Sequence, residues 1–274
     1  MPRILVALAL SSHPLPSLAV TAITVVMGFT VGLEPWRLVL LGLAVLIGQL
    51  AVGLSNDWLD VERDRAVGRR DKPVADGRIP IVAVRASAIV ATVVGAALML
   101  PLGWAAALAH AAFIAAGWAY NAWLKRTAFS VLPYLGFGLL PLIVTLARPE
   151  PAVAAPWAIA AGALLGVSAH FGNVLPDLVD DRATGVNGLP HRLGRRGTGL
   201  VIAVSLAAAS VAIVLGSGAQ AALLGGLGIS LVLAVVCAAL VLVDRASRAV
   251  FWIIIAAALI DVALLALAGQ RLVA

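Results

Sequence analysis

The segment "NDWLDVERDRAVGRRDKP", residues 56–73, carries ten charged side chains in eighteen positions. The chain as a whole is apolar: of its 274 residues, 62% are hydrophobic and only 12% are charged. A soluble domain usually has about 25% charged and about 45–50% apolar residues. The contrast predicts a polytopic membrane protein in which residues 56–73 lie outside the hydrocarbon layer.

Long apolar runs, bounded by Pro, Gly and charged residues, flank this segment on both sides. A helix needs about 20 residues to cross the hydrocarbon core, whereas barrel strands are about half as long and alternate in polarity. The runs therefore predict an all-α protein with nine transmembrane helices. The predicted spans are 15–33, 37–56, 80–100, 103–121, 129–147, 156–176, 198–216, 219–243 and 249–268.

The positions of Lys and Arg predict the orientation, because these residues gather in cytoplasmic loops. With nine spans, sixteen of the nineteen basic residues fall on the side that contains the N-terminus, and only Arg37, Arg148 and Arg271 fall on the other. We therefore expect a multi-pass protein of a prokaryotic cell membrane, with residues 56–73 in the cytoplasm. The net charge of +6 reflects this topology, so no nucleic-acid partner is expected. The N-terminal apolar run resembles a signal peptide only faintly, and we expect it to be retained.

The charged segment recurs 117 positions later. Residues 56–78 and 173–195 align without a gap and share the pattern N-x3-D-x3-D-R-A-x-G-x4-P-x3-G-R, which makes nine identities in 23 positions. Each copy follows an even-numbered predicted span. This predicts one domain, residues 1–274, made of two related halves at about 1–125 and about 126–274. Residues 56–64 are called the first acidic motif below, and residues 173–181 the second.

Polar side chains recur at every fourth residue of each motif. On a helix this spacing keeps them on one face, with a drift of about 40° per step. The two rows consist of Asn56, Asp60 and Asp64, joined by Asp57, and of Asn173, Asp177 and Asp181. Carboxylates crowded at a membrane boundary repel one another and are costly to desolvate. Mg²⁺ would remove that cost, since it takes oxygen ligands and bridges to phosphate.

Basic residues follow each acidic motif directly, among them Lys72 and Arg182. Acidic groups for a metal and basic groups for phosphate are the pairing expected of a metal–diphosphate site. A third polar element, "YNAWLKRT" at 120–127, is expected to face the same compartment.

These motifs resemble those of the UbiA superfamily of intramembrane prenyltransferases. That family has nine helices, N-D-x-x-D-x-x-x-D after helix 2, D-x-x-x-D after helix 6 and Y-x4-K between helices 4 and 5. This chain has "NDWLDVERD", "DLVDD" and the pair Tyr120 and Lys125 in those places. The loop "GRRDKPVADG" departs from the family, since many relatives have Arg-Pro where this chain has Lys72 and Pro73.

The resemblance implies that two Mg²⁺ ions bind an isoprenyl diphosphate. The implied metal ligands are Asn56, Asp57, Asp60, Asp64, Asp177 and Asp181, and the repeat adds Asn173 as a further ligand. The implied catalytic residues are Asp60, Asp64, Asp177 and Asp181. The expected diphosphate-binding residues are Arg65, Arg70, Lys72, Lys125 and Arg182. Tyr120 and His170 are expected to line the reaction chamber.

The implied reaction is transfer of an isoprenyl group to a lipophilic, aromatic or quinonoid acceptor within the bilayer. Two variants within the family stay open: cyclisation of the prenyl diphosphate without an acceptor, and transfer from a phosphoribosyl diphosphate to a polyprenyl phosphate. A transporter is the alternative from another class, although transporter sites tend to lie near the midplane rather than at one face. Asp261, inside the last predicted span, is expected to face a helix partner or a cavity.

Overall fold

The computed structural model describes residues 2–178, 185–218, 221–242 and 248–274, and the regular secondary structure within these ranges is helical apart from an isolated bridge between Ala154 and Val273. The first half contains α1 (Pro2–Ser11), α2 (Pro14–Thr30), α3 (Pro35–Leu59), α4 (Val61–Ala66), α5 (Ile81–Met99), η1 (Leu100–Leu102) and α6 (Trp104–Ala122). The second contains η2 (Leu124–Arg126), α7 (Leu132–Leu135), η3 (Gly136–Gly138), α8 (Leu139–Leu146), α9 (Pro156–Val174), η4 (Leu175–Asp177), α11 (Leu189–Gly216), α12 (Ala221–Leu242), α13 (Arg248–Ala268) and η5 (Gly269–Leu272). The predicted all-α class is confirmed.

Each predicted span coincides with helix in the described ranges. Pro14, Pro35 and Pro156 open α2, α3 and α9, as expected from a residue with a fixed φ and no N–H to leave unpaired. The predicted span 129–147 is broken into α7, η3 and α8, a stretch that contains two prolines and two glycines. Two features differ from expectation: α1 is a separate helix, and α11 begins nine residues before the predicted span and bends at Gly194, where φ is +70°.

Length and hydropathy identify fewer membrane crossings among the described residues than the nine predicted. Among the described residues, α3, α5 with η1, α9, α11 and α12 are each long and apolar enough to cross a bilayer. The pair α1 and α2 makes a sixth if it is taken as one span bent by 62°. The protein is thus a multi-pass membrane protein, and the count of nine spans stays a prediction.

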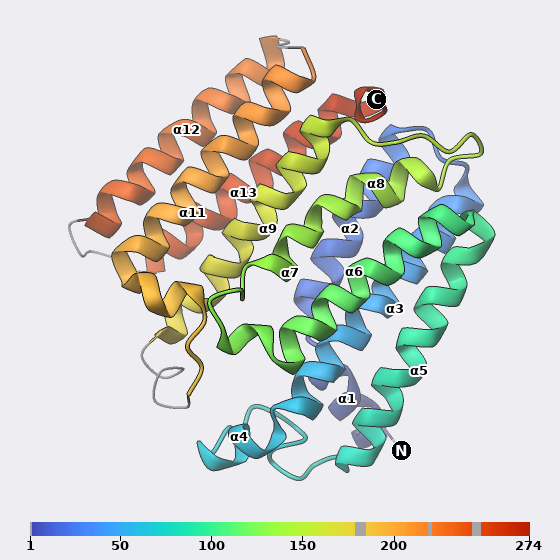
Figure 1. Cartoon of the computed structure of the whole chain (residues 1–274), viewed down its shortest axis with the longest axis vertical. Helices are drawn as coiled ribbons and strands as arrows, with labels where there is room; N and C mark the ends of the chain where they lie inside the picture. The colour runs from blue at the N-terminus through green and yellow to red at the C-terminus, as the bar shows by residue number, and fades with distance from the viewer. Residues whose placement is uncertain (1, 179–184, 219–220, 243–247) are drawn as a thin grey trace.

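The helices form one bundle (Figure 1). α11, α12 and α13 pack together on one side, α3, α5 and α6 lie on the other, and α2, α8 and α9 lie between them. The outward faces of α5 and α12 expose apolar side chains such as Val93 and Val235, as expected of a surface in contact with lipid. α4 and the C-terminal end of α9 lie at the same end of the bundle, away from the C-terminus. Both acidic motifs therefore begin at one end of the molecule.

Gly53 allows the link between α1 and α2 to cross α3 in direct contact, because a Cβ at this position would overlap the backbone of Ser12. We expect Gly53→Ala to lower the free energy of unfolding by about 1–3 kcal/mol through overpacking. Gly225→Ala in α12 is the matched control, since its Cβ would meet nothing within 4 Å, and it should be neutral or slightly stabilising. Thermal unfolding in detergent measures both, and equal shifts in the two variants would show that the crossing is not tight.

Candidate active site

The first acidic motif forms one helical run across the junction of α3 and α4. Asp60 lies at the junction with φ −96° and ψ 0°, yet the Asp60 amide donates to the Asn56 carbonyl at 3.0 Å and the Asp64 amide to the Asp60 carbonyl at 2.8 Å. Asn56, Asp60 and Asp64 thus follow the predicted four-residue spacing. The side chains of Asp57, Asp60 and Asp64 are only 1–2% exposed, so each needs a cation or hydrogen-bond donor nearby.

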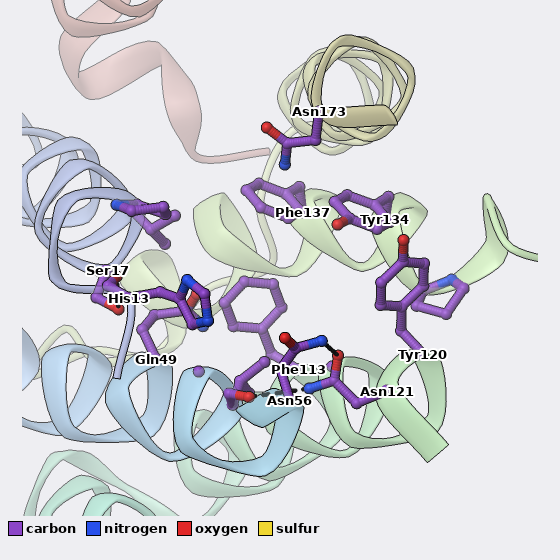
Figure 2. Close-up of a pocket in the computed structure, with 16 residues that line it drawn as sticks. His13, Ser17, Gln49, Asn56, Phe113, Tyr120, Asn121, Tyr134, Phe137 and Asn173 are labelled. Carbon is purple, nitrogen blue, oxygen red and sulfur yellow. Dashed lines mark hydrogen bonds between the residues drawn. The ribbon is translucent and has the colours of Figure 1, made fainter. Parts of the chain in front are cut away.

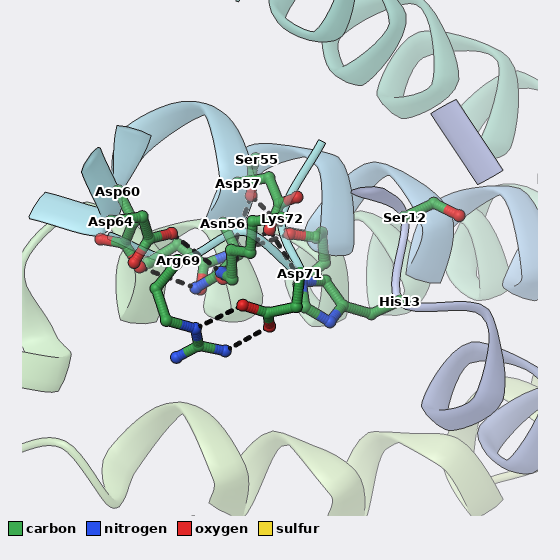
Figure 3. Close-up of polar contacts among 12 residues, drawn as sticks. Ser12, His13, Ser55, Asn56, Asp57, Asp60, Asp64, Arg69, Asp71 and Lys72 are labelled. Carbon is green, nitrogen blue, oxygen red and sulfur yellow. Dashed lines mark hydrogen bonds and ion pairs between the residues drawn. The ribbon is translucent and has the colours of Figure 1, made fainter. Parts of the chain in front are cut away.

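Lys72 supplies that cation for two of the three carboxylates (Figure 3). The loop after α4 folds back over the motif, and the Lys72 ammonium lies 2.9 Å from Asp57 Oδ1, 3.1 Å from Asp64 Oδ2 and 3.1 Å from Asn56 Oδ1. Lys72 is itself buried, with 8% exposure. These three oxygens, from Asn56, Asp57 and Asp64, are called the oxygen cradle below. The structure thus places the predicted phosphate ligand Lys72 among the predicted metal ligands.

Asp60 is neutralised by a second lysine that comes from a distant part of the chain. Lys125, in η2, places its Nζ 2.5 and 2.6 Å from the two Asp60 oxygens. Burial lowers the pKa of Lys125, and the Asp60 carboxylate partly offsets that effect. Arg63 lies 3.2 Å from Asp60 and 3.4 Å from Asp64. In the structure the three carboxylates face Lys72, Lys125 and Arg63, and the expectation that Mg²⁺ relieves their repulsion stays a prediction.

The arginines that follow the motif point elsewhere. Arg65 is exposed and pairs with Glu62 at 3.3 Å, because one residue after Asp64 its side chain leaves the helix about 100° away from the cradle. Arg70 is exposed, and its carbonyl accepts a hydrogen bond from Arg78. Their role in binding diphosphate stays a prediction. Arg182, like Asp181, lies outside the described residues.

Asp71 belongs to the same loop but not to the cradle. Arg69 donates two hydrogen bonds to its carboxylate at 2.8 and 2.9 Å. This hydrogen-bonded pair lowers the pKa of Asp71 to about 2. Since Asp71 is exposed, it offers a charge-matched comparison for the buried aspartates.

A cavity of about 290 Å³ adjoins the cradle, and both acidic motifs reach it (Figure 2). Asn56 of α3 and Asn173 of α9 line this cavity from facing walls. It is called the chamber below. Asp177 closes η4, directly after α9. The first positions of the two repeated motifs therefore share one chamber, although they are 117 residues apart in the sequence.

The predicted chamber residues take different positions. Tyr120 lines the chamber, together with Tyr134, which the sequence did not suggest. His170 is buried behind that wall, with its ring centroid 4.6 Å from that of Tyr134 and 5.6 Å from that of Tyr120. Its Nε2 lies 3.0 Å from the Ser130 hydroxyl. His170 thus supports the aromatic wall rather than forming it.

Two further residues join the site, and of these only Asn121 lies in a segment that the sequence singled out, the polar element at 120–127. His13 lies at the break between α1 and α2 with φ +52°, and its Nε2 is 3.0 Å from Asp57 Oδ1. Asn121, at the end of α6, accepts a hydrogen bond from Asn56 at 3.2 Å and donates to the Ser55 hydroxyl at 2.8 Å. Asn121 belongs to the polar element that was expected to face the same compartment as the motifs, whereas nothing local linked His13 to Asp57, 44 residues away.

The oxygen cradle fits a magnesium ion. Within the described ranges no three Asp, Glu, His or Cys side chains converge on a common metal position. The cradle instead combines two carboxylates and one amide oxygen, and it already surrounds a positive charge, the Lys72 ammonium, at 2.9–3.1 Å. Mg²⁺ takes such oxygen ligands and leaves its other positions to water or phosphate. The first motif thus provides a suitable donor set, with Lys72 at the position of the cation.

Part of the chain is similar to curated biosynthetic enzymes. It is 25% identical over 175 residues to digeranylgeranylglyceryl phosphate synthase of Pyrococcus horikoshii, which covers 61% of each chain. It is 34% identical over 172 residues to the bacteriochlorophyll synthase 33 kDa chain of Cereibacter sphaeroides, which covers 59% of this chain and 56% of that one. The chain thus spans about three fifths of the length of these relatives.

The similarity of the fold extends over nearly the whole chain. A UbiA homologue from Archaeoglobus fulgidus, solved with bound GPP and Mg²⁺, matches with a TM-score of 0.69 at 14% identity, covering 96% of this chain and 98% of that one. The family model described as the UbiA prenyltransferase family matches residues 4–260. This protein therefore belongs to the UbiA prenyltransferase family.

Proposed function

We propose that the protein transfers an isoprenyl group from its diphosphate to a lipophilic, aromatic or quinonoid acceptor within the membrane, in a reaction that depends on Mg²⁺. The observation that supports this most directly is the oxygen cradle, which surrounds a cation beside a chamber lined by both motifs. A structurally similar homologue is bound to GPP and Mg²⁺. Two curated relatives are named digeranylgeranylglyceryl phosphate synthase and bacteriochlorophyll synthase 33 kDa chain.

Asn56, Asp57 and Asp64 would hold one Mg²⁺, and Asn173, Asp177 and Asp181 are proposed for a second. Bound Mg²⁺ would supply charge neutralisation to the departing diphosphate. Lys72 would leave the cradle and donate to phosphate oxygens from the mobile end of its long side chain. Lys125 and Arg63, already beside Asp60, would add positive charge where the negative charge of the leaving group grows.

The walls of the chamber suit the organic half of the reaction. Breaking the C1–O bond leaves an allylic cation, which water would trap. Phe113, Phe137 and Tyr134 line the chamber with aromatic rings, and ring faces stabilise a passing cation. Apolar walls also exclude water, so the cation survives until the electron-rich carbon of the acceptor attacks C1 and then gives up its proton to a base.

The topology completes the proposal. The ends of α3 and α9, where the two motifs begin, lie at one end of the bundle, and the distribution of Lys and Arg supports a cytoplasmic position for that end. The chain is proposed to be one domain of two related halves, with the diphosphate at the cytoplasmic end and the isoprenyl tail within the bilayer.

The decisive experiment measures diphosphate release by the purified protein in detergent, with Mg²⁺ and a series of isoprenyl diphosphates, in the presence and absence of aromatic acceptors. A prenyltransferase releases diphosphate only with an acceptor and yields a prenylated product by mass spectrometry. Release without acceptor, together with a cyclic hydrocarbon, would identify a terpene cyclase instead. If chelation of Mg²⁺ has no effect, or no donor is consumed, the proposed reaction is wrong, and transport becomes the better explanation.

A further inference from the structure

A second cavity lies beyond the chamber, and its walls are almost entirely apolar. It has a volume of about 150 Å³, and Ser168 is the one polar residue among the described residues that line it. Ile23, Met27 and Leu140 belong to its wall. Among the described residues, Phe137 alone lines both this cavity and the chamber. A cavity of this composition suits a hydrocarbon and offers little to a diphosphate or a polar acceptor.

Two segments of the chain line first the chamber and then the second cavity. On α2, Val20 lines the chamber, and Ile23, less than one turn further along, lines the second cavity. On the opposite wall, Tyr134 lines the chamber, whereas Leu140 lines the second cavity. Phe137 lies between those two residues in the sequence. The lining residues thus place the two cavities next to each other, with Phe137 in the wall of both.

The local structure holds the Phe137 ring firmly at this point. Phe137 is the middle residue of η3, the turn that separates α7 from α8, and it is flanked by Gly136 and Gly138. Its ring packs edge-on against Phe113 at 5.5 Å and stacks parallel to Tyr134 at 6.0 Å between centroids. On α9, a Cβ at Gly162 would lie 2.7 Å from the Phe137 carbonyl. The glycine thus lets α9 pack directly against the turn that carries the ring.

We propose that Phe137 limits the length of the isoprenyl chain that the protein accepts, because its ring separates the chamber from the apolar cavity into which a longer chain would extend. This inference rests on the proposed function, since it assumes that an isoprenyl diphosphate binds with its diphosphate at the cradle. The occupant of the second cavity is then the far end of a long isoprenyl tail. Removing the ring joins the two spaces into one longer apolar path.

The test compares the binding of non-reactive thiodiphosphate analogues with C10 and C20 tails, in the presence of Mg²⁺, by wild type, Phe137→Ala and Phe113→Ala. Phe113 is the matched control, because its ring lines the chamber but not the second cavity. We expect Phe137→Ala to shift the ratio of Kd values by about tenfold or more in favour of C20, since each added methylene in an apolar pocket carries a substantial effect. Phe113→Ala should leave the ratio within about twofold of wild type. Phe137→Trp should shift it toward C10.

An unchanged ratio in Phe137→Ala, or an equal shift in Phe113→Ala, would overturn the assignment. Phe137→Leu, which keeps an apolar side chain in the core, provides a milder variant if Phe137→Ala unfolds. Because binding is measured without turnover, the chain-length effect can be found even if the transfer reaction itself is absent. Conversely, if none of the analogues binds in the presence of Mg²⁺, both the inference and the proposed function are wrong.

Discussion

Asp64→Asn is expected to reduce Mg²⁺-dependent diphosphate release by about 10²–10³-fold, equivalent to about 3–4 kcal/mol of transition-state stabilisation. Asp64 contributes one oxygen of the cradle, 3.1 Å from the Lys72 ammonium. The substitution keeps the size of the side chain but removes its negative charge, and an amide can present N–H groups toward a cation. The measurement is the initial rate of diphosphate release at saturating donor and Mg²⁺.

The choice of Asp64 avoids a folding artefact. Replacing Asp60 would leave Lys125 buried without its carboxylate, and an unpaired buried charge is strongly destabilising. Asp71→Asn is the control, because Asp71 lies in the adjoining loop and pairs with Arg69 in an exposed position. It should retain a rate within about threefold of wild type. Equal rates for Asp64→Asn and Asp71→Asn would remove Asp64 from the catalytic site.

Lys72→Met is expected to make the stability of the protein depend on Mg²⁺. Without the ammonium, Asp57 and Asp64 lose the cation that both contact, and breaking a buried ion pair from one side costs about 3–5 kcal/mol. Mg²⁺ would replace the lost charge, so adding it should raise the thermal unfolding temperature of Lys72→Met more than that of wild type. In wild type the ion must first displace Lys72, which weakens its apparent binding.

Thermal unfolding in detergent, with and without Mg²⁺, measures this effect independently of turnover. Arg70→Met serves as the control, because Arg70 is exposed in the same loop. Its unfolding temperature should match that of wild type in both conditions. If Mg²⁺ fails to stabilise Lys72→Met beyond its effect on wild type, the cradle does not hold the ion.

Local patterns in the sequence predicted the parts of the structure that depend on neighbours along the chain. Apolar run length predicted the helices, and the four-residue spacing predicted the row formed by Asn56, Asp60 and Asp64, because helical geometry alone fixes both. α1 was missed as a helix because its ten residues are too few to cross a bilayer. The repeat predicted two related halves, and the resemblance implied that both motifs bind one diphosphate. Both stay predictions, although Asn56 and Asn173 line one chamber.

Contacts between distant segments could not be predicted in the same way. The turn at Gly68, with φ +69°, lets the loop after α4 double back, but the sequence does not say that Lys72 ends in the cradle. Likewise, Arg63 was expected only to set the topology, although it lies beside Asp60 and Asp64. Such contacts follow from tertiary packing, which no local spacing encodes.

For Asp261, too, the sequence predicts that the side chain needs a polar partner but does not predict which residues provide it. A carboxyl group inside a transmembrane helix requires a polar partner, and the structure provides one. Asp261 of α13 accepts hydrogen bonds from Ser210 of α11 and Ser230 of α12, and the two hydroxyls lie 2.6 Å apart. The need for a partner was predictable from Asp261 alone. The identity of the partners depended on how three helices pack.

The most direct test of the account is anomalous diffraction from crystals of the protein grown with Mn²⁺, as a substitute for Mg²⁺, and a prenyl thiodiphosphate. The account predicts an anomalous peak bound by Asn56, Asp57 and Asp64 at about the 2.1 Å expected for Mg²⁺, with the Lys72 ammonium moved onto the phosphate. A second peak is predicted beside Asn173 and Asp177. Thiodiphosphate bound in the chamber with Lys72 still in the cradle, and no metal peak there, would contradict it.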